Sequence, residues 1–379
     1  MARKTLGEIS TFITKGATPT TYGYKWQTFG VPFLRSECVS SQGLDMRQSM
    51  FISEGADQSL RRSRVKDGDI LMTITGNVGR VVRLTGIGSA NINQHIARVR
   101  IKDRNFDPSF VYHFLSQGTM REYYESIVTG QAYPQISLVQ VRSTPMPEIG
   151  VEEQKEIARA LDDADELIGT LEGLIAKKQA IKQGMMQQLL TGRTRLEGFT
   201  EPWGARPLGD LLAYEQPGRY LVATTDYTPS GIPVLTAGKT FILGRTQERN
   251  GIFEAVPVII FDDFTTASKY VGFPFKAKSS AMKMLSARTE VNLRFVFERM
   301  QLIDFVAVDH KRRWIAEYSR IQVAVPSRNE QDAVAAVIQD ADREIEVLNQ
   351  RRAKARAIKQ GMMQQLLTGR VRLPAEAAA

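Results

Sequence analysis

One internal repeat constrains the fold of this 379-residue chain more than any other feature of its sequence. The fourteen letters AIKQGMMQQLLTGR occupy Ala180–Arg193 and occur again, 177 residues later, at Ala357–Arg370. The same shift, without a gap, aligns Glu153–Leu196 with Glu330–Leu373 and gives 26 identical residues in 44 positions. A match of this length is not chance, so the chain contains two copies of one structural unit.

Both copies have the apolar spacing of a long helix that packs against another helix. Apolar residues recur at steps of four and three, which places them on one seam of an α-helix. Acidic residues near Glu153 and Glu330 suit the helix starts, and Gly192 and Gly369 suit left-handed helix ends. The seam needs a partner helix, and the simplest partner is the other copy, packed antiparallel. The residues expected in this spacer-helix packing are Ile157, Leu161, Ile168, Leu171, Val334, Ile338, Ile345 and Leu348.

The repeat divides the chain into a domain, a helix, a second domain and a second helix. We place the first domain at 1–150, its spacer helix at 151–193, the second domain at 194–326, its helix at 327–373 and a tail at 374–379. Residues 95–101 alternate as a strand does, whereas 110–127 and 291–305 have helical spacing. The expected fold class is α+β: two tandem mixed α/β domains, each followed by a long helix, with the helices forming an antiparallel coiled coil of internal pseudo-two-fold symmetry.

The composition indicates a globular, basic protein. Apolar residues make up 42% and charged residues 24%, and the formal net charge is +9. A basic excess attracts polyanions, of which nucleic acid is the usual one and an anionic membrane surface the next. Cys38 is the only cysteine, which fits a reducing compartment, and no apolar run reaches the length of a signal peptide or a membrane span. We therefore expect a cytoplasmic protein with no membrane association.

Basic and amide side chains in both domains are candidates for DNA contacts. Arginine and lysine suit phosphate oxygens and guanine edges, and glutamine and asparagine suit adenine edges. The same residue types are equally common on solvated faces and in turns. The candidates are Arg61, Arg62, Arg64, Asn93, Gln94 and Gln135 in the first domain and Lys269, Lys311, Arg312 and Arg313 in the second.

The sequence contains no motif that predicts catalysis by this chain. Its three histidines, His95, His113 and His310, lie far apart without a carboxylate or cysteine at metal-ligand spacing, so no metal site is expected. Asp262-Asp263 followed by Lys269 does not have the acidic-x-lysine spacing of a nuclease. The chain is expected to be non-catalytic and to hold no cofactor of its own.

Several short motifs, in a fixed order, resemble the specificity (S) subunit of type I restriction–modification systems. They are Leu6-Gly-Glu-Ile9, Gly68-Asp-Ile-Leu71, Gly76-Asn-Val-Gly79, Asn93-Gln-His-Ile96, Gln135-Ile-Ser137 and Gln187-Gln-Leu-Leu-Thr-Gly192. The resemblance covers essentially the whole chain. The second domain departs from it, because Lys278-Ser-Ser-Ala-Met-Lys283 stands where Asn-Gln-His is expected.

This resemblance implies a function and a set of partners. Two target recognition domains would each bind half of a bipartite asymmetric site in double-stranded DNA. Modification (M) subunits, expected to be two, would dock on the chain and methylate adenine with S-adenosylmethionine, and restriction (R) subunits would use ATP and Mg. Two alternatives stay open at this point: a coiled-coil scaffold that does not read DNA, and an enzyme that acts on nucleic acid by itself.

Overall fold

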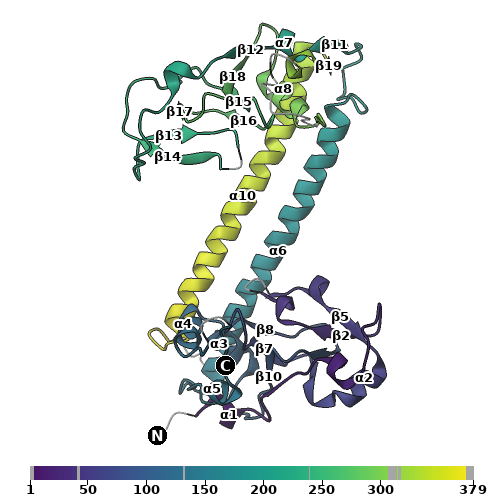
Figure 1. The fold of residues 1–379 in the computed structure, drawn as a ribbon, viewed down its shortest axis with the longest axis vertical. Helices are drawn as coiled ribbons and strands as arrows, with labels where there is room; N and C mark the ends of the chain where they lie inside the picture. Colours follow the sequence, from purple (N-terminus) through teal and green to yellow (C-terminus); the bar gives the residue numbers. More distant parts are fainter. Residues whose placement is uncertain are drawn as a thin grey trace, which may run out of the picture. The chain divides into compact units, whose positions relative to one another are not determined.

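The computed structural model describes residues 4–40, 43–130, 133–238, 240–305, 314 and 317–372. Its internal contacts divide the chain into two compact units (Figure 1). Unit 1 comprises Met1–Glu172 and Gln350–Ala379, and unit 2 comprises Gly173–Asn349. Each unit therefore combines one domain with one part of each long helix, so the division falls within the helices.

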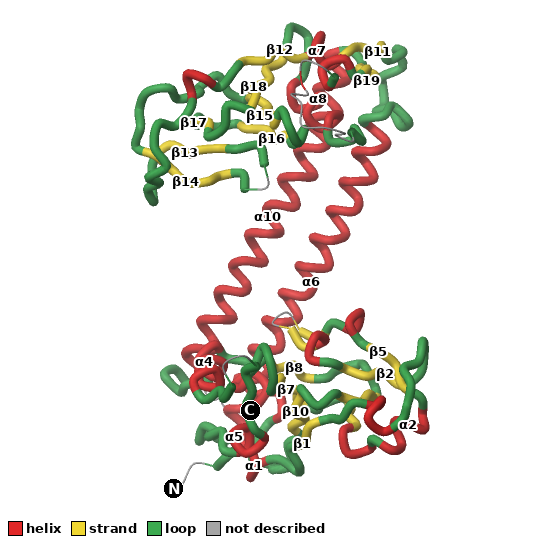
Figure 2. The backbone as a smooth tube through the Cα atoms, viewed as in Figure 1, coloured by secondary structure: helices red, strands yellow, loops and turns green. Residues whose placement is uncertain are grey.

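Unit 1 contains two four-stranded sheets (Figure 2). The first has the antiparallel order β1 (Thr14–Lys15), β10 (Ile96–Val99), β7 (Ile70–Thr73) and β8 (Val81–Arg83). The second has the order β5 (Met50–Ile52), β2 (Val31–Leu34), β9 (Ser89–Ile92) and β6 (Arg64–Lys66), with β2 and β9 parallel. The strands β3 (Val39–Ser40) and β4 (Gly43–Leu44) form a separate two-stranded sheet. The helices are α1 (Leu6–Ile9), α2 (Glu54–Ser59), α3 (Pro108–Leu115), α4 (Gly118–Ser126) and α5 (Leu138–Arg142).

Unit 2 repeats this plan with a different sequence. Its first sheet has the antiparallel order β12 (Leu212–Glu215), β18 (Met282–Ala287), β15 (Val258–Asp262) and β16 (Ser268–Val271). Its second sheet has the order β14 (Ile242–Thr246), β13 (Ile232–Leu235) and β17 (Lys276–Ala277), with β13 and β17 again parallel. A separate pair joins β11 (Gly204–Pro207) to β19 (Gln322–Val325), and the short helices are α7 (Leu208–Leu211) and α8 (Leu293–Met300).

The long helices are α6 (Val151–Leu189) and α10 (Arg328–Leu366), and they pair antiparallel within each unit. In unit 1, Lys359 of α10 pairs with Asp165 of α6. In unit 2, Lys182 of α6 pairs with Asp342 of α10, which is the same contact moved by the repeat shift. The repeat seen in the sequence is therefore also a repeat of tertiary contacts.

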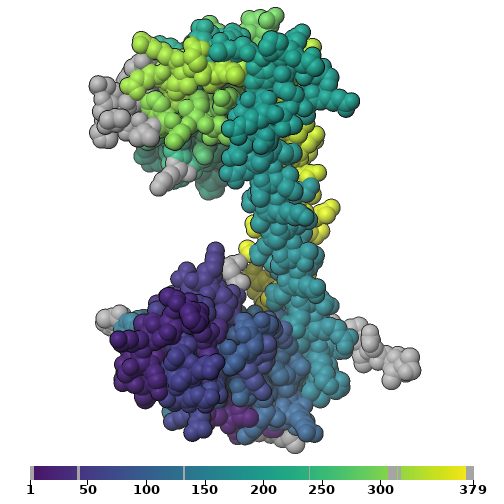
Figure 3. Space-filling view, turned by 90° about the vertical axis from the view of Figure 1, so that its right-hand side faces the viewer, coloured from purple at the N-terminus to yellow at the C-terminus, as the bar shows by residue number. Residues whose placement is uncertain are grey.

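A buried glutamine attaches each domain to its helix in the same way. The side-chain oxygen of Gln154 accepts a hydrogen bond from the backbone of Asp107, which caps α3, at 3.0 Å. Gln331 accepts from Asn292, which caps α8, at 2.9 Å. Both glutamines are buried. In Figure 3 the purple-to-blue domain residues of unit 1 lie against the teal residues of α6, as these contacts require.

The helix seam contributes to a separate apolar cluster in each unit. Ile157 and Leu161 pack with Phe110 of α3 and with Leu366. Their repeat equivalents in unit 2 join a cluster with Phe295 of α8. Of the eight residues expected in the seam, seven are buried and one is half-buried: Ile157, Leu161, Ile168, Leu171, Val334, Ile338 and Leu348 are buried, and Ile345 is half-buried.

The predicted fold class is confirmed: two tandem mixed domains, each followed by a long helix. The helical spacing at 110–127 corresponds to two helices, because Gln117 is extended and starts α4. The helix expected over 291–305 is shorter, since the Asn292 side chain caps its start and it ends at Met300. Backbone bonds from Leu302 to Arg299 and from Ile303 to Met300 then form a turn.

Candidate nucleic-acid interface

The turn between β9 and β10 carries amide side chains that are held by their neighbours. Asn93 is buried, and its Oδ1 accepts a hydrogen bond from the backbone N–H of His95 at 3.1 Å. Gln94 accepts from the hydroxyl of Thr18 at 2.6 Å, and its Nε2 lies 3.0 Å from Nε2 of His95. Because the amide N–H donates, the His95 nitrogen is the acceptor. Asn93 thus shapes the turn, and Gln94 presents an oriented amide.

Close backbone approach brings Thr18 to this turn. The N–H of Gly16 donates to the carbonyl of Asn93 at 3.1 Å. A Cβ at Gly16 would lie 1.7 Å from the carbonyl oxygen of Ile92, so only glycine fits at this position. The small residue after β1 is therefore what allows the 16–18 segment to lie against the turn.

A third segment, at 133–135, completes the arrangement. The Tyr133 ring stands edge-on to His95, with centroids 6.2 Å apart, and it is 59% exposed. Gln135 is exposed, and its backbone forms β-bridges with Thr75 and Thr129. We call Thr18, Gln94, His95, Tyr133 and Gln135 the amide cluster. It combines donors, acceptors and an aromatic ring of the kind that contacts base edges and bases.

The three arginines predicted near residue 61 have different environments. Arg61 and Arg62 are exposed, and the Arg62 guanidinium lies 5.6 Å from the centre of the Phe12 ring. Arg64 is half-buried and pairs with the buried carboxylate of Asp57. Because this carboxylate holds its guanidinium, Arg64 is less available to a phosphate than the other two arginines.

The second domain presents a different set of side chains. Lys269 is exposed on β16, whereas Lys311, Arg312 and Arg313 lie outside the described residues. Lys283, on the strand equivalent to β10, is fully buried and pairs with buried Asp263 at 3.0 Å. Its Nζ also donates to Gln216 at 2.9 Å. This lysine stabilises the interior of unit 2 and is not at the surface.

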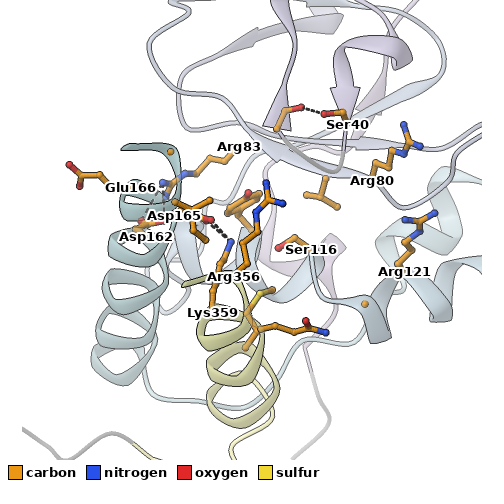
Figure 4. A pocket seen from close by; sticks show the side chains of 18 of the residues that line it. Ser40, Arg80, Arg83, Ser116, Arg121, Asp162, Asp165, Glu166, Arg356 and Lys359 are labelled. Carbon is orange, nitrogen blue, oxygen red and sulfur yellow. Dashed lines mark hydrogen bonds and ion pairs between the residues drawn. The ribbon is translucent and has the colours of Figure 1, made fainter. Parts of the chain in front are cut away.

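A cleft of about 840 Å³ lies in unit 1 between the domain and the two long helices (Figure 4). We call it the spacer cleft. The domain contributes Arg80, Arg83 and Arg121, and Figure 4 shows Arg80 and Arg121 together on one side. The helices contribute Arg356, Lys359 and the carboxylates Asp162, Asp165, Glu166 and Glu172. Several of these charges pair with one another, as Arg356 does with Glu172 and Arg83 with Asp162.

Arg80 stands apart from these pairs. Its Nε is buried without a hydrogen-bond partner. Within the described ranges no carboxylate forms an ion pair with it. Arg121, beside it, pairs with Glu125 at 2.9 Å in solvent. An unpaired guanidinium at the rim of a cleft suits a phosphate oxygen.

Asp162 links the domain of unit 1 to helix α6. It accepts hydrogen bonds from Ser109 at 2.6 Å and from the fully buried His113 at 2.8 Å, both on α3, and it pairs with Arg83 of β8. Burial opposes ionisation of Asp162, yet these hydrogen bonds and the Arg83 charge bring its pKa down to about 2. The carboxylate is therefore ionised at neutral pH and binds donors from two elements of the domain.

The described residues contain no group of three histidine, cysteine or acidic side chains placed to hold a metal ion. Among them, too, no helix combines the length and the apolar character that a bilayer crossing requires.

Sequence reasoning located only part of this surface. It identified Gln94, which contacts Thr18 and His95, and Gln135, whose backbone bridges to Thr75 and Thr129, but not Thr18, His95 or Tyr133. The amide-rich segment 131–135 was a signal for Tyr133. No sequence pattern indicated Arg80 or Arg121, because the spacer cleft that they line forms only when α4 and α10 pack near β8.

Comparison with known proteins gives consistent results. Residues 1–183 match the family described as the type I restriction modification DNA specificity domain. A specificity subunit of a type I restriction enzyme from Escherichia coli is 50% identical over 138 residues, which cover 35% of this chain and 34% of that protein. The aligned region thus spans about a third of that relative's length. A specificity subunit from Methanocaldococcus jannaschii is 22% identical over 82% of this chain and 80% of that protein.

A solved structure shares the fold over nearly the whole chain. It is an S subunit of a type I restriction–modification system from M. genitalium, with a TM-score of 0.66 at 15% identity. The superposition covers 99% of this chain and 96% of that one. At this level of identity the likeness concerns the fold alone.

Proposed function

We propose that this chain is a DNA specificity subunit of a type I restriction–modification system and that it recognises a bipartite, asymmetric site in double-stranded DNA. The family match over residues 1–183 and the 50% identity to a specificity subunit over 138 residues support this proposal. Each domain would read one half of the site. In unit 1 the amide cluster would contact bases, and Arg61, Arg62 and Arg80 would contact phosphates. Asn93 and Arg64 would support these contacts from within the fold.

One observation carries this proposal: the same scaffold is built twice with different surface side chains. The first sheets of the two units share one strand order, and the buried glutamines and helix ion pairs recur at the repeat shift. In contrast, Asn93-Gln94-His95 before β10 is replaced by Ser279-Ser280-Ala281 before β18. A conserved frame with divergent loops suits two readers of different half-sites. A scaffold without DNA recognition gives no reason for this divergence.

The chemistry would belong to partner subunits. M subunits, two per chain, would dock on the repeated helices and carry S-adenosylmethionine, and R subunits would add ATP and Mg. The chain itself would be non-catalytic. Equivalent ion pairs in both units support two similar docking surfaces, since each unit presents the same helix face.

The proposal is tested by mapping methylated adenines with the chain and its methyltransferase partner. Gln94→Ala should relax the requirement at one base position, with a loss of about 1–3 kcal/mol of discrimination there. The other half-site should not change. Gln58→Ala, an exposed glutamine on α2, is the matched control. If Gln94→Ala leaves the recognised sequence unchanged, this residue does not read a base. If the wild-type chain shows no sequence preference, the proposed function is wrong.

A further inference from the structure

A buried arginine on β10 carries its charge into the interior of unit 1. Arg98 is only 8% exposed. Its neighbours on that side of the sheet are Ile96, two residues before it, and Leu71, its partner on β7. Both belong to an apolar cluster that residues of the two four-stranded sheets form together. Because a guanidinium stays protonated in proteins, Arg98 places a positive charge beside this cluster.

No carboxylate of the described residues pairs with Arg98. The nearby carboxylate of Asp69 binds Arg100 instead, at 2.5 and 2.6 Å. Arg98 donates from Nη1 to the carbonyl of Arg64 at 2.6 Å, and its Nε is buried without an acceptor among the described residues. Burial, and then the charge of Arg100, lower the pKa of Arg98. A buried charge without a partner destabilises a fold.

Unit 2 folds without an arginine at this position. The N–H of Lys102 donates to the last residue of α1, and the N–H of Arg288 donates to the last residue of α7, which aligns β10 with β18. In this alignment Met284 corresponds to Arg98. Met284 is fully buried in an apolar cluster. The shared scaffold therefore accepts an apolar side chain here, and packing does not explain the arginine of unit 1.

Arg98 lies behind the exposed arginines of unit 1. Its acceptor, the carbonyl of Arg64, directly follows the turn Arg61–Ser63. This turn lies against β1, whose Thr14 is the register partner of Arg98. Both arginines of the turn are exposed. Positive charge is thus stacked in two layers, one in solvent and one in the interior.

We propose that Arg98 and the turn Arg61–Ser63 form one binding site for a backbone phosphate of DNA. The bound phosphate supplies the counter-charge that Arg98 lacks in the free chain. The exposed arginines hold the phosphate from the solvent side, and Arg98 attracts it from the interior, where charges are less screened. This inference rests on the proposed function and deepens it, because it assigns a binding role to a residue within the fold.

The test is Arg98→Met, which places the residue of unit 2 at this position. The free energy of unfolding in urea should equal or exceed that of the wild type, because a buried unpaired charge is removed. Binding to a fluorescein-labelled duplex, measured by anisotropy with the methyltransferase partner present, should weaken at least about fivefold for every sequence. The slope of the logarithm of the binding constant against the logarithm of salt concentration should fall by about one.

Two further variants separate the charge of Arg98 from its other properties. Arg98→Lys keeps the charge and should bind the duplex within about threefold of the wild type. Lys102→Met is the matched control, since it removes one positive charge at an exposed position four residues along the chain. It should change the affinity by less than about twofold, because solvent screens that charge.

Three outcomes would overturn the proposal. If Arg98→Met lowers the stability and the affinity together, Arg98 only holds the turn in place. Wild-type affinity and salt slope in Arg98→Met would exclude a role in binding phosphate. Binding by Arg98→Lys as weak as that by Arg98→Met would show that the charge is not what matters. These comparisons use any duplex, so they still test the phosphate site if the wild-type chain shows no sequence preference and the proposed function is wrong.

Discussion

Replacing Asp162 by asparagine should loosen the attachment of α3 to helix α6 in unit 1. The carboxylate accepts from Ser109, from the buried His113 and from Arg83. Asparagine keeps the size of the side chain, but it loses the negative charge and turns one acceptor into a donor. The substitution therefore weakens three contacts without creating a cavity.

The size of the effect follows from burial. A hydrogen bond to a charged group contributes about 1.5–3 kcal/mol, and more is lost when a buried partner is left unpaired. The Asp162 side chain is 36% exposed, so water replaces part of what is lost. We expect the local free energy of opening to fall by about 1–2 kcal/mol, which corresponds to roughly 5–30-fold faster amide exchange.

Hydrogen exchange followed by mass spectrometry measures this directly. Peptides covering α3 should exchange faster in Asp162→Asn at pH 7, whereas those covering α8 in unit 2 should not change. Asp163→Asn, an exposed carboxylate one residue away, controls for the change in charge. Unchanged α3 exchange in Asp162→Asn, or an equal effect of Asp163→Asn, would refute the assigned role.

The pH dependence has a definite sign. The pKa of Asp162 in the fold, about 2, is below its ordinary value of 3.8. A lowered pKa contributes stability above the unfolded value, and this contribution is lost as pH falls through the folded value. The difference in the local free energy of opening between wild type and Asp162→Asn should thus be fully present above about pH 5. It should disappear between about pH 4 and pH 2, once the exchange rates are corrected for the intrinsic pH dependence of amide exchange.

Three further predictions concern the cleft and the helix pairing. Arg80→Ala should weaken binding to all DNA sequences alike. The slope of the logarithm of the binding constant against the logarithm of salt concentration, measured by titration at several salt concentrations, should fall by the equivalent of about one phosphate contact. An unchanged slope would exclude Arg80 as a phosphate contact. Lys359→Asp should lower the free energy of unfolding by about 1–2 kcal/mol, because it places a second carboxylate beside Asp165. Adding Asp165→Lys should restore the melting temperature. A double variant that is no more stable than the single variant would contradict this pairing. Leu161→Ala should lower the free energy of unfolding in urea by about 3 kcal/mol, whereas Leu167→Ala, at a 52% exposed position, should cost under about 0.5; equal losses would show that the seam is misassigned.

The sequence was most informative where it repeats. The copied helix segments predicted α6, α10 and their antiparallel pairing, because periodic apolar spacing and glycine ends are local signals. The alternation at 95–101 is also a local signal, and the strand it predicted is present as β10 (Ile96–Val99).

Long-range pairing was not predictable in this way. The division of each domain into two sheets depends on the parallel pairs β2–β9 and β13–β17, whose strands are far apart in the chain. Lys283 has the sequence context of a surface lysine, yet Asp263 pairs with it in the interior. The amide cluster joins residues 18, 94 and 133 only through the fold, so its aromatic member was missed.

The central claim is that one chain carries two independent readers, and methylation mapping of paired variants tests it most directly. The wild-type chain with its methyltransferase partner should modify a two-part, asymmetric sequence with a fixed gap. Substitution of the amide cluster in unit 1 should alter one half of that sequence, and substitution of Lys269 or its surface neighbours in unit 2 should affect only the other. A single contiguous motif, or a change in both halves from substitutions in one unit, would contradict the account.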